Sequence, residues 1–122
     1  MPTPRPGKPV RGSTTGRPLM AAMDLFGRRW ALRILWELRG GPLGARALLA
    51  RCDGLSSSVL YQRLRELSSS GIIVPSADGY ELTRLGTALR DALRPFDEWA
   101  STWAREQERA DQEPAPGRPL PD

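Results

Sequence analysis

The sequence predicts a mainly α-helical fold with a small β-hairpin wing: a winged helix-turn-helix, dimerised through its first and last helices. Two helical patterns are joined by a tight turn, and the second of them is the serine-flanked stretch GLSSSVLYQRLRELSSSG at residues 54–71. Two short β-type runs and then a long amphipathic helical pattern follow. This order of elements is the one expected for a helix-turn-helix that carries a hairpin.

The folded part of the 122-residue chain is expected at residues 18–104, as one small domain. Nine of the 12 prolines lie in residues 1–18 or 114–122, where apolar residues are scarce. Such segments cannot bury enough apolar surface to offset the entropy of ordering. The sequence therefore predicts disordered tails at residues 1–17 and 105–122, around a domain whose thin core often needs a partner chain.

The first half of the domain contains three short helical patterns. Residues 19–26 can form a helix that ends at Gly27, and residues 30–39 follow with apolar side chains at spacings of three and four. Gly40-Gly41-Pro42 stops this second helix. Residues 45–51 form a third helix with a weaker signal.

A tight connection at residues 52–55 leads to the serine-flanked helix. Gly54 can adopt the positive φ of a helix C-cap. Ser56 is a good N-cap, and Leu55 can pack on Leu60 as a hydrophobic staple. The pattern therefore predicts a helix that begins directly after Ser56.

A hairpin and a long helix complete the predicted fold. Residues 72–74 and 80–82 are short strands with Asp78-Gly79 as the turn between them. Thr83 can cap a last helix that runs through Trp103, and Pro95 is expected to kink it. The stripe of that helix consists of Leu85, Leu89, Ala92, Leu93, Phe96, Trp99, Ala100 and Trp103.

The helix at residues 56–69 has two different faces at about 100° per residue. Val59, Leu60, Leu64 and Leu67 fall on the half that must face the core. The other half carries one charge among several hydrogen-bonding groups, whereas a merely solvated helix usually carries more Glu–Lys pairs. Groups that both donate and accept are what base edges in the major groove require. The pattern favours a recognition helix over a plain surface helix.

The residues predicted to contact DNA are polar or basic. The free N–H groups of Ser56 to Val59 can hold a phosphate, Gln62 can pair with adenine, and Arg65 can pair with guanine. The full predicted set is Ser56, Ser57, Ser58, Tyr61, Gln62 and Arg65 on this helix, with Arg46 and Arg29 outside it. Arg63 falls between Val59 and Leu67 on the inward flank, so we expect it to bury its stem and pair with an acid such as Asp91 or Glu81.

The charge distribution is compatible with a polyanionic partner. The net charge is +4, and residues 1–19 hold four basic residues and no acid. This suits nucleic acid, but an arginine-rich proteome would produce the same excess. Residues 72–83 contain no Lys or Arg, which weakens the expected wing contact. The basic N-terminal tail is either a minor-groove arm that replaces this contact or a solvated linker.

Aromatic and apolar residues predict a dimer and leave room for a ligand. A thin domain cannot cover the stripe of the last helix alone, so a second copy of the chain is expected to pack on it and on the first helix; a core stripe in a monomer is the alternative. The predicted dimer residues are Leu19, Met23, Phe26, Leu89, Leu93, Phe96, Trp99 and Trp103. Trp30, Trp36, Trp99 and Trp103 are candidates for a pocket that binds a small aromatic effector, although core packing explains at least two of them.

The composition argues against catalysis, metal binding and a membrane location. The chain has no histidine, and one cysteine cannot form a zinc site, so we expect no catalytic residues, metal or cofactor. GGPLG at residues 40–44 lacks the Lys and Ser or Thr of a phosphate loop. No apolar run approaches the roughly 18 residues of a membrane span. One cysteine and the lack of a signal peptide suggest a cytoplasmic protein.

Three stretches resemble the HxlR family of bacterial winged helix-turn-helix regulators, relatives of the MarR group. They are MDLFGRRW at residues 23–30, GLSSSVLYQRLRELSSSGII at 54–73 and YELTRLG at 80–86, and the resemblance extends over about residues 17–103. It implies a homodimer that binds a pseudo-palindromic operator and switches transcription. Some members of the family respond to oxidants or electrophiles.

The sequence departs from the family pattern at three positions. Arg17 stands beside Pro18 where the family usually has a cysteine, which excludes thiol sensing by that route. Ser57-Ser58 replaces a frequent Pro-Lys pair, which removes a phosphate-binding charge. Cys52 occupies a usually apolar position, where a buried structural thiol is favoured over a redox switch. Ser58 and the uncharged wing leave open a second function, a winged-helix module for protein or aromatic-ligand binding with weak or lost DNA binding.

Overall fold

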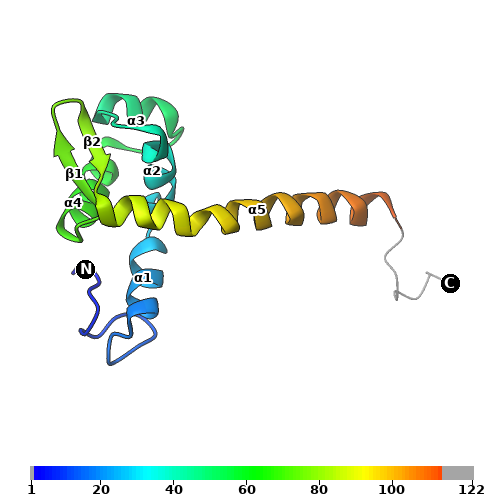
Figure 1. Ribbon diagram of the computed structural model, residues 1–122, viewed down its shortest axis with the longest axis horizontal. Helices are drawn as coiled ribbons and strands as arrows, with labels where there is room; N and C mark the ends of the chain where they lie inside the picture. Colours follow the sequence, from blue (N-terminus) through cyan, green and yellow to red (C-terminus); the bar gives the residue numbers. More distant parts are fainter. Residues whose placement is uncertain (1, 114–122) are drawn as a thin grey trace. The chain divides into compact units, whose positions relative to one another are not determined.

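The computed structural model describes residues 2–113 of the chain (Figure 1). It is mainly helical with one two-stranded antiparallel hairpin, as the sequence predicts. The chain divides into two compact units, Met1–Arg90 and Asp91–Asp122, which are described separately below. The elements in chain order are α1 (Pro18–Phe26), α2 (Ala31–Glu37), a 3-10 turn (Leu38–Gly40), α3 (Ala45–Arg51), α4 (Ser57–Ser69), β1 (Ile73–Ser76), β2 (Gly79–Leu82) and α5 (Arg84–Gln112).

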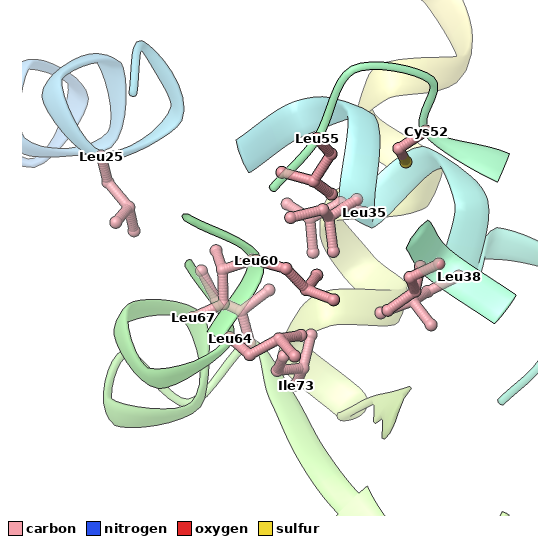
Figure 2. Close-up of a cluster of buried hydrophobic side chains, with 12 residues drawn as sticks. Leu25, Leu35, Leu38, Cys52, Leu55, Leu60, Leu64, Leu67 and Ile73 are labelled. Carbon is pink, nitrogen blue, oxygen red and sulfur yellow. The ribbon is translucent and has the colours of Figure 1, made fainter. Parts of the chain in front are cut away.

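The core of the first unit is built from apolar side chains of the first four helices and the start of the hairpin. Leu60, Leu64 and Leu67 of α4 have at most 1% of their surface exposed. Figure 2 shows them in the same cluster as Leu35 and Ile73. Burial of such a stripe removes apolar surface from water and fixes the rotation of the helix. The inward face of α4 is therefore the one that the sequence predicts.

The start of α2 differs from the prediction. Trp30 has a φ of 75° and precedes the helix, which begins at Ala31. A residue in the left-handed region cannot continue a right-handed helix, so the periodic pattern that includes Trp30 overstates the helix by one residue. Trp30 still packs against the core. At the other end, Leu38–Gly40 forms a 3-10 turn instead of a last α-helical turn.

The connection between α3 and α4 has the predicted geometry. Gly54 has a φ of 90°, and the backbone N–H of Leu55 donates to the carbonyl of Cys52 at 3.0 Å. The hydroxyl of Ser56 accepts from the N–H of Val59 at 3.3 Å, which caps α4. The bounds of α3 and the N-cap of α4 are confirmed.

The hairpin turn lies one residue earlier than predicted. Ser76 pairs with Gly79 across the strands, so Ala77 and Asp78 form the two-residue loop. Gly79 instead lies where the backbone of Leu43 runs beside β2. The backbone of Leu43 exchanges two hydrogen bonds with that of Tyr80, the residue after Gly79. A Cβ on Gly79 would lie 2.4 Å from the carbonyl oxygen of Leu43. Close approach of another backbone, rather than the turn, requires glycine here.

Thr83 fixes the start of α5 to the segment that follows α4. Its hydroxyl accepts from the N–H of Gly86 at 3.1 Å and donates to the carbonyl of Gly71 at 2.6 Å. A Cβ on Gly86 would lie 2.2 Å from the carbonyl oxygen of Ile72. The predicted cap is confirmed, and a glycine contact that the sequence does not reveal accompanies it.

In the second unit, α5 continues beyond its predicted end at Trp103 and reaches Gln112. Residues 104–112 are rich in Ala, Arg, Glu and Gln, which favour helices, and Arg109 pairs with Glu106 one turn away. Part of the predicted C-terminal disorder, residues 105–112, is therefore helical, while residues 114–122 lie outside the described chain. Phe96, Trp99 and Trp103 stack in sequence along the helix, with ring centroids 5.9 and 5.7 Å apart.

Residues 2–17, for which the sequence predicts disorder, form a turn-rich segment in the structure. The N–H of Gly7 donates to the carbonyl of Gly16 at 2.9 Å, and Val10 and Ser13 exchange backbone hydrogen bonds. The backbone N–H of Arg11 donates to the carboxylate of Asp24 on α1 at 3.2 Å. Polar anchors on the helical part provide contacts that low hydrophobicity alone does not predict.

Candidate nucleic-acid interface

The outward face of α4 carries the predicted DNA-contacting side chains. Tyr61, Gln62 and Arg65 are exposed on the side opposite the leucine stripe, and the first turn adds Ser57 and Ser58. Within residues 2–113 the side chains of Tyr61, Gln62 and Arg65 make no hydrogen bond or ion pair with the protein. Their donors and acceptors are therefore available to a partner.

One of the serines at the start of α4 caps the helix. The hydroxyl of Ser56 caps the helix through Val59 and lies 3.3 Å from the hydroxyl of Ser58. The hydroxyls of Ser56 and Ser58 are thus engaged within the protein, which distinguishes them from Ser57, Tyr61, Gln62 and Arg65. The N–H groups of Ser57 and Ser58 belong to the first turn of α4, where a helix has unpaired donors.

The two predicted basic residues outside α4 are both exposed. Arg29 lies in the connection between α1 and α2, and Arg46 lies in the first turn of α3. The backbone carbonyl of Arg29 accepts from Nε of Arg63 at 2.7 Å, which ties this connection to α4. The side chain of Arg29 remains exposed beside that contact.

A groove of about 500 Å³ lies between α4 and the hairpin. Tyr61, Arg65 and Ser69 line one side, and Pro75 and Tyr80 line the other. The sequence prediction does not include Pro75 and Tyr80, because for the wing it rests only on the absence of Lys and Arg. The period-two pattern of a strand cannot show which of its faces will look toward a helix that precedes it in the chain.

Arg63 lies on the inward flank of α4, as predicted, but its acid partner is Glu66, one turn along the same helix. Nη1 of Arg63 donates to Glu66 at 2.9 Å, and Arg28 also pairs with this carboxylate. The side chains of Arg28, Arg63 and Glu66 are only 14%, 13% and 8% exposed. Two nearly buried guanidiniums on one carboxylate give charge-assisted hydrogen bonds that fix the α1–α2 connection against α4.

The sequence prediction misses Glu66 and Arg28. Glu66 falls at the edge of the apolar half of the wheel, next to Val59 and Arg63. The i,i+3 spacing from Arg63 is a signal that could have indicated the pair. The contribution of Arg28 could not be read from the pattern, because it comes from a distant connection.

Cys52 is fully buried in the core of the first unit. Burial raises the pKa of its thiol above the ordinary value of 9.0; Arg33 opposes this effect and Glu37 adds to it. A thiol that keeps its proton is a poor nucleophile and behaves as a small apolar side chain.

The predicted dimer residues differ in exposure. In the first unit, Leu19 and Met23 of α1 are 65% and 60% exposed, whereas Phe26 and Leu89 are half-buried and pack against the core. In the second unit, Leu93 is half-buried and Phe96, Trp99 and Trp103 are each more than half exposed. Both units thus present large apolar side chains to solvent.

Each unit contains two of the predicted ligand-pocket tryptophans. In the first unit, Trp30 packs on the core, while Trp36 is 41% exposed beneath Arg39, whose guanidinium carbon lies 3.8 Å from the ring centroid. In the second unit, Trp99 and Trp103 stack on each other.

Among residues 2–113, no group of three or more acidic, cysteine or histidine side chains is placed to hold a metal ion. No helix in that part of the chain has the length and apolar character to cross a membrane.

The order of elements and the unpartnered polar face of α4 define a helix-turn-helix DNA-binding domain with a hairpin wing. The profile described as HxlR-like helix-turn-helix matches residues 25–108, and the chain belongs to this family. The curated relatives are HTH-type transcriptional regulators. The chain is therefore a transcriptional regulator with a helix-turn-helix DNA-binding domain.

Individual relatives agree with this assignment. The uncharacterized HTH-type transcriptional regulator YvaP of Bacillus subtilis is 32% identical over 89 residues, which cover 67% of this chain and 82% of YvaP. The quinone-bound structure of YodB from B. subtilis matches with a TM-score of 0.65 and 29% identity, over 70% of this chain and 97% of that one. A possible MarR-family regulator from Enterococcus faecalis V583 matches with a TM-score of 0.67 and 27% identity, over 82% and 97%.

Proposed function

We propose that the chain acts as a homodimer on a pseudo-palindromic operator, with α4 inserted in the major groove of DNA. The observation that carries this proposal is the outward face of α4. Tyr61, Gln62 and Arg65 have no partner within residues 2–113, while the opposite face of the helix is anchored in the core. A polar helix held in this way is suited to direct readout, because the core fixes which of its side chains point outward before DNA arrives.

The chemistry of this face suits base edges and phosphates. An amide such as Gln62 can pair with adenine through two hydrogen bonds, and Arg65 can pair in the same way with guanine. Ser57 and Ser58 supply hydroxyls and N–H groups at the helix start, where a phosphate is stabilised. Arg29 and Arg46 add positive charge that contributes affinity without reading sequence.

A second copy of the chain is the proposed cover for the exposed apolar surfaces of α1 and α5. Exposed aromatic side chains such as Trp99 and Trp103 lose contact with water when a partner packs on them. A two-fold symmetric dimer then carries two α4 helices, which suit half-sites about one helical turn, or ~34 Å, apart. We also propose a cytoplasmic location, which suits the single cysteine of the chain.

The proposal is tested by titrating the protein against its own upstream DNA in a mobility-shift assay. We expect a discrete complex with two protein chains per duplex and an affinity that falls steeply with salt. Binding that is absent even at low salt would instead support a winged-helix module that has lost DNA binding. A scrambled duplex of the same length is the control for sequence-independent binding.

The dimer is tested by sedimentation of Trp99→Ser beside the wild-type chain. We expect the variant to dissociate at concentrations at which the wild type is a dimer, because the substitution removes a large apolar contact. Trp36→Ser is the matched control, since Trp36 is an exposed tryptophan outside the proposed interface. Equal association of all three proteins would place the interface elsewhere.

A small aromatic effector is also proposed, with Trp30, Trp36, Trp99 and Trp103 as candidate contacts. The support for it is the similarity to YodB, whose structure holds a quinone. Quenching of tryptophan fluorescence by a benzoquinone, saturable and lost in one of the four Trp→Phe variants, is the expected result. Quenching that rises linearly with concentration would mean collision without a site.

A further inference from the structure

A cavity of about 310 Å³ lies beside α4, within the first unit, and adjoins the polar face described above at Gln62. Its lining comes from three segments that are distant in the sequence. Met23, Asp24, Gly27 and Arg28 come from α1 and the connection that follows it. Gln62 and Arg63 come from α4, and Arg11 of the N-terminal segment completes the lining. This volume lies at the lower end of the range for small-molecule pockets.

The lining carries an excess of positive charge. Arg11, Arg28 and Arg63 contribute three guanidiniums, and Asp24 is the one carboxylate among the lining residues. Glu66 pairs with both Arg28 and Arg63, so its single negative charge compensates only one of their two positive charges. The carboxylate of Asp24 accepts from the backbone of Arg11 and not from its side chain.

Part of the donor capacity of these arginines is unused. In the described part of the chain, the guanidinium of Arg11 has no partner, and Nη2 of Arg63 makes no hydrogen bond. Guanidinium donors in a forked geometry match the oxygens of phosphate and carboxylate groups. A partly enclosed site lowers the effective dielectric and strengthens such pairs relative to those on an open surface.

We propose that this cavity binds the phosphate or carboxylate group of a small molecule, with Arg11 and Arg63 as its principal ligands. A free anion is the favoured occupant over a phosphate of duplex DNA. The side chains of Arg28 and Arg63 are only 14% and 13% exposed, so a small anion can approach their guanidiniums more closely than a rigid duplex can.

Binding at this site has a consequence for DNA that depends on the function proposed above. Gln62 belongs both to the lining of the cavity and to the outward face of α4. An anion here places negative charge beside the surface that would meet DNA phosphates and competes for the Gln62 amide. Occupancy is therefore expected to weaken operator binding.

The test uses the full chain and two probes, inorganic phosphate and malonate, at constant ionic strength with chloride as the replaced anion. Side-chain signals of Arg11, Gln62 and Arg63 are followed by nuclear magnetic resonance. We expect saturable shifts with a Kd on the order of 1 mM, reasonable for a ligand of so few atoms. Shifts that do not saturate, or that spread evenly over all arginines, would overturn the proposal.

Three variants separate a built site from general charge attraction. Arg11→Gln is expected to weaken binding about tenfold, whereas Arg5→Gln, which removes the same charge from the same segment outside the cavity, should change it less than about twofold. Asp24→Asn should strengthen binding, since it removes the one lining carboxylate. Equal effects of Arg11→Gln and Arg5→Gln contradict the proposal.

A DNA titration separates the failure of this site from the failure of the proposed function. Phosphate should weaken operator binding by the wild type and have little effect on Arg11→Gln. If the protein bound no DNA, the anion titration would still test the proposed anion site independently. If Arg11→Gln weakened DNA binding while free phosphate failed to saturate, the cavity would hold a DNA phosphate and the proposal would be wrong.

Discussion

Arg63 and Arg65 lie two residues apart on α4, in opposite environments. The side chain of Arg63 is 13% exposed, and its donors reach the carbonyl of Arg29 at 2.7 Å and the carboxylate of Glu66 at 2.9 Å. Arg65 is exposed and, within residues 2–113, makes no ion pair or hydrogen bond through its side chain. A rotation of about 200° between the two positions causes this difference. The same substitution should therefore affect two different properties.

Arg65→Ala is expected to weaken binding to the operator by about 1–3 kcal/mol and to leave the melting temperature unchanged, because the side chain is free in the unbound protein. Arg63→Ala is the matched comparison, and it should mainly lower the free energy of unfolding. Fluorescence anisotropy and thermal denaturation of both variants check the pair. An Arg63→Ala protein that melts like the wild type but no longer binds DNA would reverse the two roles.

Glu66→Gln is expected to lower the free energy of unfolding by roughly 3 kcal/mol, because it leaves two nearly buried guanidiniums without their counter-charge. Glu106→Gln is the control: Glu106 also pairs with an arginine three residues away, but its side chain is 57% exposed. Such an exposed pair contributes about 0–1 kcal/mol. Chemical denaturation measures the free energy of unfolding of both variants. Similar decreases for the two would argue against the burial of the Glu66 cluster.

Gly86→Ala is expected to destabilise the first unit by about 2 kcal/mol or more, because the new Cβ would lie 2.2 Å from the carbonyl oxygen of Ile72. Relief of this overlap requires α5 to move away from the segment after α4. Gly40→Ala introduces a Cβ with no atom within 4 Å and serves as the control. The prediction fails if the two variants unfold at the same denaturant concentration.

Cys52 is expected to be unreactive toward a thiol reagent in the folded protein and reactive once guanidinium unfolds the chain. The raised pKa also has a consequence for stability. The folded state holds the thiol proton more tightly than the unfolded state, so the free energy of unfolding should fall as pH rises through 9.0, the ordinary thiol value. Fast labelling of the native protein at neutral pH, or loss of DNA binding on mild oxidation, would show an accessible redox switch instead.

Local signals in the sequence predicted the helices, the cap at Ser56 and the orientation of α4 well. These features depend on side chains within one or two turns of each other, and the leucine spacing alone rotates α4 with Tyr61 and Arg65 outward. The fold class followed from the order of such elements. The end of α5 was underestimated because the tail after Trp103 is polar, yet its residues favour a helix even without an apolar stripe.

Features that join distant segments could not be predicted. The role of Gly79 depends on the passage of Leu43, and the burial of Glu66 depends on Arg28 from another connection. The cavity beside α4 depends on Arg11, which lies in a segment whose composition predicts disorder. In each case the local sequence pattern contains only one of the interacting residues, so the spacing of residues within it cannot indicate the other.

Selection of bound fragments from random DNA, carried out in parallel with the wild type and Arg65→Ala, tests most directly whether the outward face of α4 reads base edges. The wild type is expected to enrich a two-fold symmetric motif, and Arg65→Ala should lose the preference at one base pair in each half-site while keeping the others. Enrichment of the same motif with the same base preferences by both proteins would contradict the assignment of α4 as the recognition helix.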